Sequence, residues 1–300
     1  MVEPIGKIEL FGKEVPLRTH SCSFMGKPGY PLEKPHIDLY IRTKDCNSRC
    51  QFCIWHSDAQ NFNEKKFHQV FEEIIPKIRI RKIAVTGGEP TLNWKLFENI
   101  VSISRHYVGP KTYMSMNTDG LRLQRLFDDP IHQEFNQIHI SRHHWDDSLN
   151  NEIFNSVTPT AEQLAWAQNT TKSKHQIQLS CNLIKGYIDN KEKMYQYLEF
   201  VNSLKINNCG FVSLMPVNEY SKENYIGCNI EDLVNERFNV VGFRDYKGAC
   251  ECSNYAYFPE DLRSHIRVYH KNTYEPDKIQ ETLVFDGENL RLGFGGELVF

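Results

Sequence analysis

The sequence lacks several features that would place it outside the ordinary globular enzymes. No apolar run approaches the eighteen or so residues that a membrane-spanning helix needs. The first residues, MVEPIGKIELFGKEV, do not combine a charged segment with an apolar stretch, so they do not resemble a secretory signal. There is no internal repeat and no low-complexity tract. We therefore expect a cytoplasmic protein with no membrane partner.

The chain also has little net charge, −3 over 300 residues, but that charge is unevenly distributed. Residues 218–300 contain nine Lys and Arg against fifteen Asp and Glu, a net of −6, which leaves +3 for the rest of the chain. Nucleic-acid binding needs clustered Lys and Arg, so an acidic C-terminal segment argues against a nucleic-acid partner.

Cysteine, in contrast, is abundant for a cytoplasmic chain, with nine residues. Three of them lie within eight residues, in KDCNSRCQFCIWH (44–56), at positions Cys46, Cys50 and Cys53. An odd total with such a cluster fits metal or redox chemistry better than a disulfide framework. Thiolates favour zinc or iron–sulfur clusters, and three thiolates on a four-iron cube would leave one iron open to a further ligand. A zinc site that uses His56 as its fourth ligand is the alternative.

Hydrophobic periodicity predicts alternating strands and helices between residues 36 and 217. The expected strands are 36–42, 81–90, 112–117, 137–141, 176–184 and 211–217. The expected helices are 63–78, 93–108, 121–127, 147–155, 160–168 and 191–204. Six parallel βα units predict an α/β fold, a partial (β/α)6 barrel whose functional groups gather at the carboxyl ends of the strands.

The predicted organisation has three parts. Residues 1–35 form a lead-in that begins with a hairpin at KIELFGKEVPL, and residues 36–217 form the barrel core. Residues 218–300 form a small α+β extension, with a helix near 230–238 and a hairpin within 265–294.

The CNSRCQFC run resembles the CxxxCxxC signature of the radical S-adenosylmethionine (radical SAM) superfamily. Phe52 before the last cysteine, the position of the loop after the first strand, and the GGEP sequence that ends the second strand support the resemblance. It covers roughly residues 36–217. It implies a 4Fe–4S cluster on Cys46, Cys50 and Cys53, whose open iron binds the methionine moiety of S-adenosylmethionine (SAM).

The resemblance also implies a SAM-binding site at the strand ends. The ammonium of SAM would meet the backbone carbonyls and the Glu side chain of GGEP, and Asn117 would face the ribose. Ser141 and Arg142 would offer a hydroxyl and a cation to the carboxylate and ribose, because an Arg fork suits a carboxylate. Residues 183–186 and Met215 would contact adenine. The expected cofactor-binding residues are Phe52, Gly87, Gly88, Glu89, Pro90, Asn117, Ser141, Arg142 and Met215.

The implied reaction is reductive cleavage of SAM to a 5′-deoxyadenosyl radical, which abstracts hydrogen from a substrate C–H bond. The cofactors carry this chemistry, and the protein positions the substrate. The expected partners are a peptide or small-molecule substrate and an electron donor such as flavodoxin or ferredoxin. His143 and His144 follow the fourth strand and are candidate catalytic residues, since histidine titrates near neutral pH.

A second group of cysteines, Cys228, Cys250 and Cys252, lies in the extension. Many superfamily members carry a C-terminal module with an auxiliary 4Fe–4S cluster, although this chain lacks the cysteines that usually follow the hairpin. The three thiols could hold such a second cluster, bind zinc or remain free, and Cys209 is the candidate for a fourth ligand.

Two further functions stay open from the sequence. One is a nucleotide-modifying enzyme that resembles GTP 3′,8-cyclase, although the chain ends in GGELVF and lacks the Gly-Gly tail of that family. The other is a non-catalytic metal-binding or redox-sensing protein.

Overall fold

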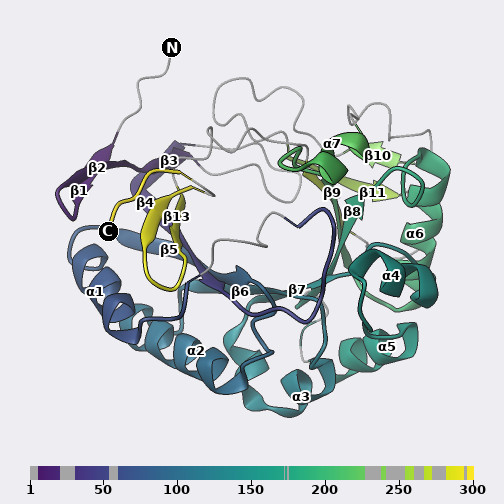
Figure 1. Cartoon of the computed structure of the whole chain (residues 1–300), viewed down its shortest axis with the longest axis horizontal. Helices are drawn as coiled ribbons and strands as arrows, with labels where there is room; N and C mark the ends of the chain where they lie inside the picture. Colours follow the sequence, from purple (N-terminus) through teal and green to yellow (C-terminus); the bar gives the residue numbers. More distant parts are fainter. Residues whose placement is uncertain are drawn as a thin grey trace.

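The computed structural model describes residues 6–20, 31–53, 60–171, 173, 176–226, 238–240, 254–259, 267–271, 282–293 and 296–300. Its main feature is a curved sheet with helices on its outer face (Figure 1). The second cysteine group, Cys228, Cys250 and Cys252, and the helix expected near 230–238 lie outside the described residues.

Six parallel strands form the centre of this sheet, and each pairs with the next in chain order. They are β4 (Pro31–Thr43), β5 (Arg79–Gly87), β6 (Tyr113–Thr118), β7 (Gln137–Ser141), β8 (Ile177–Leu183) and β9 (Asn208–Ser213). The predicted α/β fold, a partial (β/α)6 barrel, is therefore confirmed. The sixth strand covers 208–213 and not the predicted 211–217, so Met215 lies after the strand and not within it.

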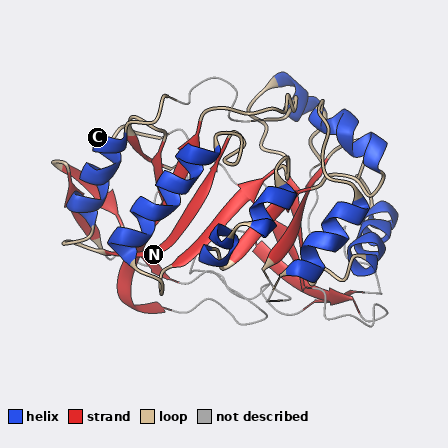
Figure 2. Cartoon of the chain, turned by 90° about the horizontal axis from the view of Figure 1, so that it is seen from below, coloured by secondary structure: helices blue, strands red, loops and turns tan. Residues whose placement is uncertain are grey.

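The helices pack on the outer face because each one buries a single apolar stripe (Figure 2). In α1, for example, Phe67, Val70, Phe71 and Ile74 are buried, and the Asn63 side chain caps the helix by accepting from the backbone N–H of Lys66. The helices of the barrel are α1 (Glu64–Ile74), α2 (Trp94–Val108), α3 (Leu123–Asp128), the 3-10 helix η1 (Pro130–Glu134), α4 (Asp147–Phe154), α5 (Ala161–Thr170) and α6 (Lys191–Ser203).

Strands of the C-terminal extension add to both edges of the core sheet. On one edge, β12 (Arg267–Lys271) pairs in parallel with β9 and continues into β11 (Asn254–Pro259) and β10 (Phe238–Val240). On the other edge, β13 (Thr282–Phe285) pairs in parallel with β4 and forms a hairpin with β14 (Leu290–Leu292). The hairpin predicted within 265–294 is formed by β13 and β14, whereas β12 lies on the opposite edge of the sheet and takes no part in it. Both outer core strands would otherwise leave unpaired backbone groups, which the extension satisfies.

An N-terminal hairpin, a short strand and a short helix complete the described chain. The predicted N-terminal hairpin is confirmed as β1 (Lys7–Leu10) and β2 (Lys13–Pro16), and β3 (Arg18–His20) pairs with β4. The short helix α7 (Glu219–Glu223) follows β9. In the part of the chain that the structure describes, none of the helices has the length and apolar character required to cross a membrane.

Candidate active site

The cysteine loop follows β4 and lies over the carboxyl ends of the neighbouring strands. Cys50 is buried, and Cys46 and Cys53 are partly buried. The backbone N–H of Arg49 donates to the carbonyl of Phe154 at 3.0 Å, and the Cys50 thiol lies 3.9 Å from the same oxygen. Phe154 is the last residue of α4, so the loop satisfies a carbonyl that the end of the helix would otherwise leave unpaired.

The three thiols are the right kind of ligand for an iron–sulfur cluster, but in this structure their side chains do not converge on one point. Among the described residues, no three His, Cys, Asp or Glu side chains are arranged to hold a metal ion. Burial raises the pKa of Cys46 to about 11 and raises the pKa of Cys50 as well. Both are neutral thiols as placed, and a metal would have to bind them as thiolates.

The GGEP segment lies directly against the cysteine loop. The N–H of Gly88 donates to the carbonyl of Thr43 at 2.8 Å, and the N–H of Glu89 donates to that of Asp45 at 2.7 Å. A Cβ on Gly88 would lie 2.1 Å from the Asp45 oxygen, and Gly87 adopts a φ of +109° that favours glycine. The two glycines are therefore required for the first two motifs to meet at the ends of β4 and β5.

The Glu89 side chain is 2% exposed and points toward the end of β6. It accepts hydrogen bonds from the Thr91 N–H at 2.9 Å and hydroxyl at 2.5 Å, from the Thr118 hydroxyl at 2.8 Å and from the Asp119 N–H at 2.7 Å. Burial, followed by the nearby Asp119 carboxyl, raises the pKa of Glu89 to about 8. The side chain was expected to receive the SAM ammonium, but in this structure it holds the ends of β5 and β6 together. The backbone carbonyls of GGEP are left for that role.

Other predicted residues lie where the sequence placed them, at strand ends. The Asn117 side chain is partly buried and donates to the Thr86 hydroxyl at 3.0 Å, which links the ends of β6 and β5. Ser141 ends β7 and is partly buried, and Pro90 is buried beside Glu89. Their contacts to SAM stay predictions.

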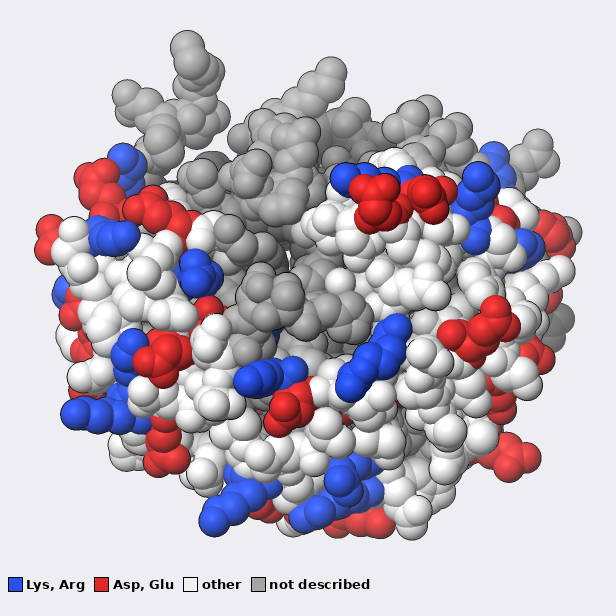
Figure 3. Space-filling view, in the orientation of Figure 1, with Lys and Arg blue, Asp and Glu red and all other residues white. Residues whose placement is uncertain are grey.

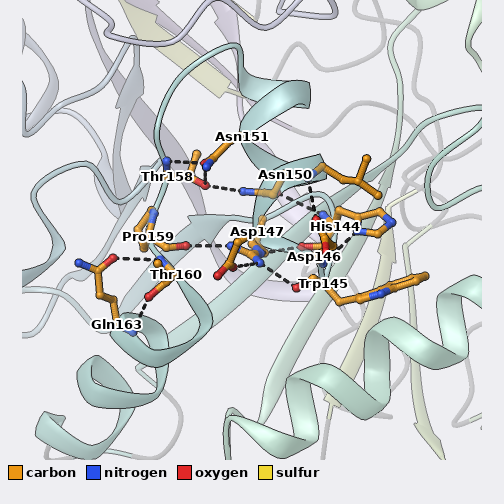
Figure 4. A network of polar contacts seen from close by, with 12 residues as sticks. His144, Trp145, Asp146, Asp147, Asn150, Asn151, Thr158, Pro159, Thr160 and Gln163 are labelled. Carbon is orange, nitrogen blue, oxygen red and sulfur yellow. Dashed lines mark hydrogen bonds and ion pairs between the residues drawn. The ribbon is translucent and has the colours of Figure 1, made fainter.

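Arg142 contacts His144, Trp145, Asp147 and Pro159, four residues that Figure 4 labels. It is 1% exposed, and its guanidinium donates to the carbonyls of His144 at 2.6 Å, Pro159 at 2.8 Å and Trp145 at 2.9 Å. It also pairs with the Asp147 carboxylate at 2.5 Å. Four of its five N–H groups are thus used inside the loop that follows β7. In this structure the guanidinium holds loop carbonyls, and the binding of Arg142 to the SAM carboxylate or ribose stays a prediction.

The two candidate catalytic histidines are also occupied within the protein. His143 stacks on Phe154, with ring centroids 4.7 Å apart, and its Nδ1 accepts from the Asn182 N–H at 3.0 Å. Burial, together with the Arg142 charge, lowers the pKa of His143 to about 3. His144 accepts from the Asp146 N–H at 3.0 Å, and burial lowers its pKa as well. Burial thus favours the neutral form of both rings, and their catalytic role stays a prediction.

Sequence reasoning missed a group of hydroxyl and carboxyl side chains behind the cysteine loop. The Ser48 hydroxyl donates to Asp119 at 2.7 Å and lies 2.8 Å from the Ser156 hydroxyl. Ser48 lies between the first two cysteines, so its contacts with Asp119 and Ser156 hold the cysteine loop against the segments after β6 and α4. The Asp119 turn was visible as NTDG, but no pattern in the sequence shows that it meets residue 48.

A small apolar cluster covers the other side of the loop. Phe52 packs there with residues from the ends of α4, β8 and β9 and from the segments that follow these strands, namely Ile153, Ile184, Leu214, Tyr187, Tyr220 and Tyr225. Its ring also lies edge-on to His143, with centroids 5.2 Å apart. The Asn218 side chain donates to the carbonyl of Gln51 at 3.0 Å and attaches the start of α7 to the loop.

The remaining described cysteines belong to the core. Cys181 and Cys209 are fully buried on the adjacent strands β8 and β9. Cys209 is the second residue of β9, at the opposite end of the strand from the cysteine loop, as its sequence position indicated. Burial raises its pKa, which is the behaviour of an inert thiol.

Comparison with known proteins agrees with this arrangement. Residues 40–201, more than half of the chain, match the family model described as the radical SAM superfamily. The chain is 27% identical over 180 residues to a protein of Thermococcus kodakarensis named probable GTP 3′,8-cyclase, a match that covers 57% of this chain and 54% of that one. It is 25% identical over 257 residues to a cysteine-type anaerobic sulfatase-maturating enzyme of Clostridium perfringens, covering 72% of this chain and 66% of the relative.

Among solved structures, the chain is similar to Streptococcus suis SuiB bound to S-adenosylmethionine. The TM-score is 0.52 at 16% identity, over 66% of this chain and 45% of SuiB. At this identity the likeness shows the fold alone. The chain thus spans less than two thirds of the length of each of these three proteins.

Proposed function

Because the chain belongs to the radical SAM superfamily, a superfamily of enzymes that use a 4Fe–4S cluster and SAM, we propose that it cleaves SAM reductively and abstracts hydrogen from a substrate C–H bond. When bound, the cluster and SAM supply a 5′-deoxyadenosyl radical. The observation that carries this proposal is the direct contact between the cysteine loop and the GGEP segment at the ends of β4 and β5.

In this proposal each part of the site has a task. Cys46, Cys50 and Cys53 hold the cluster. The Gly87 and Gly88 backbone lets SAM approach, because no Cβ stands in the way and carbonyl oxygens can accept from an ammonium. Asn117 and Ser141 contribute polar groups from β6 and β7, while Ile184 and Met215 lie near adenine. Phe52 and its apolar cluster exclude water from the radical.

The test is anaerobic incubation of the iron-loaded protein with SAM and dithionite, followed by quantification of 5′-deoxyadenosine and methionine. We expect both products from the wild type and a loss of at least about a hundredfold in Cys50→Ser, since the cysteine is a cluster ligand. Cys181→Ser changes a buried cysteine outside the loop and serves as the matched control. An iron-loaded wild type that forms no 5′-deoxyadenosine would favour the non-catalytic metal-binding or redox-sensing alternative.

Two substrate classes are supported by the relatives. A peptide is favoured by the likeness to a sulfatase-maturating enzyme, and a nucleotide by the likeness to proteins named GTP 3′,8-cyclase. Adding GTP or cysteine-containing peptides to the assay separates the two, because the true substrate accelerates 5′-deoxyadenosine formation by donating a hydrogen atom to the 5′-deoxyadenosyl radical. A second 4Fe–4S cluster on Cys228, Cys250 and Cys252 is tested by the iron that remains in a Cys46/Cys50/Cys53→Ala variant.

A further inference from the structure

The inner face of the curved sheet, on the side away from the helices, is polar (Figure 1). Along β6 to β8, side chains of the apolar core alternate with side chains that are polar or small. In β6, for example, Met114 and Met116 are buried in the core under the helices, whereas Tyr113, Ser115 and Asn117 face the other way. Large aliphatic side chains normally fill the interior of a (β/α) barrel, and none occurs at the inner positions of β6 to β8. This face is therefore suited to a polar ligand.

A belt of hydrogen bonds crosses the inner face from strand to strand and consists of Tyr113 on β6, Gln137 on β7 and Gln178 on β8. The Tyr113 hydroxyl donates to Gln137 Oε1 at 2.9 Å, and Gln137 Nε2 donates to Gln178 Oε1 at 3.1 Å. On β9, a Cβ at Gly210 would lie 2.8 Å from Gln178 Nε2, so the glycine leaves room for this amide. Because both bonds run in the same direction, the belt ends in the NH2 group of Gln178, which is a donor.

Lys82 lies at the other end of the belt. It is the register partner of Tyr113, and its ammonium is 5.9 Å from the Tyr113 ring centroid and 5.5 Å from that of Tyr40 on β4. Lys82 is partly buried and forms no ion pair with another described residue. Tyrosine rings attract an ammonium but do not neutralise its charge, so Lys82 stays available to an anion.

The carboxylate opposite Lys82 is held by a different cation. Asp38 on β4 is the register partner of Lys82, but a bulge places Arg81 next to the same carboxylate. The Arg81 guanidinium binds Asp38 through two hydrogen bonds, at 3.1 and 2.7 Å. Two cations thus share one carboxylate here, whereas Lys and Arg are interspersed with Asp and Glu over the outer surface in Figure 3. The excess of positive charge beside the belt favours an anionic ligand.

The position of Lys82 also sets the length of such a ligand. Lys82 lies five residues before Gly87 on β5, and Gly87 begins the GGEP segment beside which SAM is proposed to bind. At about 3.3 Å per residue, five residues of a strand span about 16 Å. A molecule held at Lys82 must therefore extend along the strands before one of its C–H groups meets the radical.

We propose that Lys82 and the belt bind the anionic end, a phosphate or a carboxylate, of an elongated small-molecule substrate. This inference rests on the proposed function and specifies the class of its substrate. The Lys82 ammonium binds the anion, and the amides of Gln137 and Gln178 donate to or accept from the polar groups next to it. The rest of the molecule lies along the inner face toward the ends of β5 to β8.

The test uses matched variants of this inner face. Lys82→Met removes the ammonium but keeps a long apolar side chain between the two tyrosine rings, and Lys82→Arg keeps the charge. Gln178→Glu acts from a different strand, because it adds a carboxylate to the belt and keeps the acceptor for Gln137. Lys95→Met makes the Lys82 substitution at an exposed position of α2, on the outer side of the sheet, and is the control.

Binding to the iron-loaded protein is measured by anaerobic isothermal titration calorimetry with two pairs of probes. GMP and guanosine differ by a phosphate, and suberate and its diamide differ by their carboxylates. We expect the charged probe of at least one pair to bind the wild type and Lys95→Met at least about tenfold more tightly than its uncharged partner. This preference should fall below about twofold in Lys82→Met and Gln178→Glu, and Lys82→Arg should retain it. The pair that shows the preference identifies the anion.

The failure of this inference differs from the failure of the proposed function. A wild type that prefers neither charged probe shows that the anion site is wrong. So does a preference that survives in Lys82→Met, or in Gln178→Glu where circular dichroism shows that Lys82→Met does not fold. A wild type that forms no 5′-deoxyadenosine with dithionite contradicts the proposed function itself, whatever the probes show.

Discussion

Glu89 and Arg142 are buried charged residues at neighbouring strand ends, and the two differ in what they hold together. Glu89 accepts hydrogen bonds from four donors near the ends of β5 and β6, namely the Thr91 N–H and hydroxyl, the Thr118 hydroxyl and the Asp119 N–H. Arg142 supplies donors to three carbonyls and one carboxylate, all within residues 144–159. Glu89 is thus surrounded by hydrogen-bond donors, and Arg142 is surrounded by hydrogen-bond acceptors.

Glu89 and Arg142 also differ in the charge that each carries near pH 7. Glu89 forms no ion pair with another described residue, and its pKa is raised to about 8, so near pH 7 it is largely protonated. Arg142 stays charged and has Asp147 as its counter-ion, with the Asp147 side chain 43% exposed. A buried cation with a full set of acceptors is costly to remove, whereas a neutral acid can be replaced by an amide of the same shape. The comparison predicts a much larger effect on stability at Arg142 than at Glu89.

Replacing Arg142 should have the largest effect. In Arg142→Met the carbonyls of His144, Trp145 and Pro159 lose their donor in a buried setting, and we expect a loss of about 3–5 kcal/mol in the free energy of unfolding. Arg142→Lys keeps the charge but not the planar fork, and should recover part of that loss. Urea unfolding followed by circular dichroism measures both. A loss below about 1 kcal/mol in Arg142→Met would mean that water replaces the guanidinium easily.

The Glu89→Gln variant should have a smaller and pH-dependent effect. A carboxyl whose folded pKa lies above its unfolded value binds its proton more tightly in the native state. Its contribution to stability is therefore full below the unfolded pKa and is lost as the pH rises toward about 8. We expect the stability of the wild type relative to Glu89→Gln to fall steadily between pH 5 and pH 8. The check is urea unfolding of both proteins across that range, and a difference that rises with pH would show that Glu89 is ionised and stabilised in the fold.

How far the sequence predicted these sites depends on the range of the interaction. The cysteine loop, GGEP and Asn117 were located correctly because each lies at the end of a strand with clear periodicity. The protein partners of Glu89, Arg142 and His143 were not predicted, because contacts such as those with Asp119, Pro159 and Asn182 are distant in sequence or set by loop shape. A polar residue at a strand end predicts proximity to the site, but it does not distinguish a group that binds a ligand from one that supports the loop.

The extension shows the same limit at the level of the fold. TLVF and NLRLGF were correctly predicted as strands from their alternation, and β13 and β14 confirm them. Their position beside β4 was not predictable, because pairing with a strand more than two hundred residues earlier leaves no local pattern. The hydrogen bonds from Gln60 to the Asp286 carbonyl and from Asn63 to that of Gly287 then join this hairpin to the segment after the cysteine loop.

The smallest effect should come from Ser48, which connects the two regions compared above. Its hydroxyl touches Asp119, whose N–H binds Glu89, and also Ser156, within the loop that Arg142 holds. In Ser48→Ala one neutral hydroxyl is lost, and we expect a change of about 1 kcal/mol in the free energy of unfolding. Because Ser48 lies between two proposed cluster ligands, we expect a larger effect on iron retention. Ser48→Ala should release iron to a chelator several times faster than the wild type. Ser156→Ala removes the second hydroxyl without touching the cysteine loop and is the matched control. Equal iron release from both variants would show that the hydroxyl pair stabilises the fold in general, whereas faster release from Ser48→Ala alone would show that the Asp119 contact holds the cysteine loop in place.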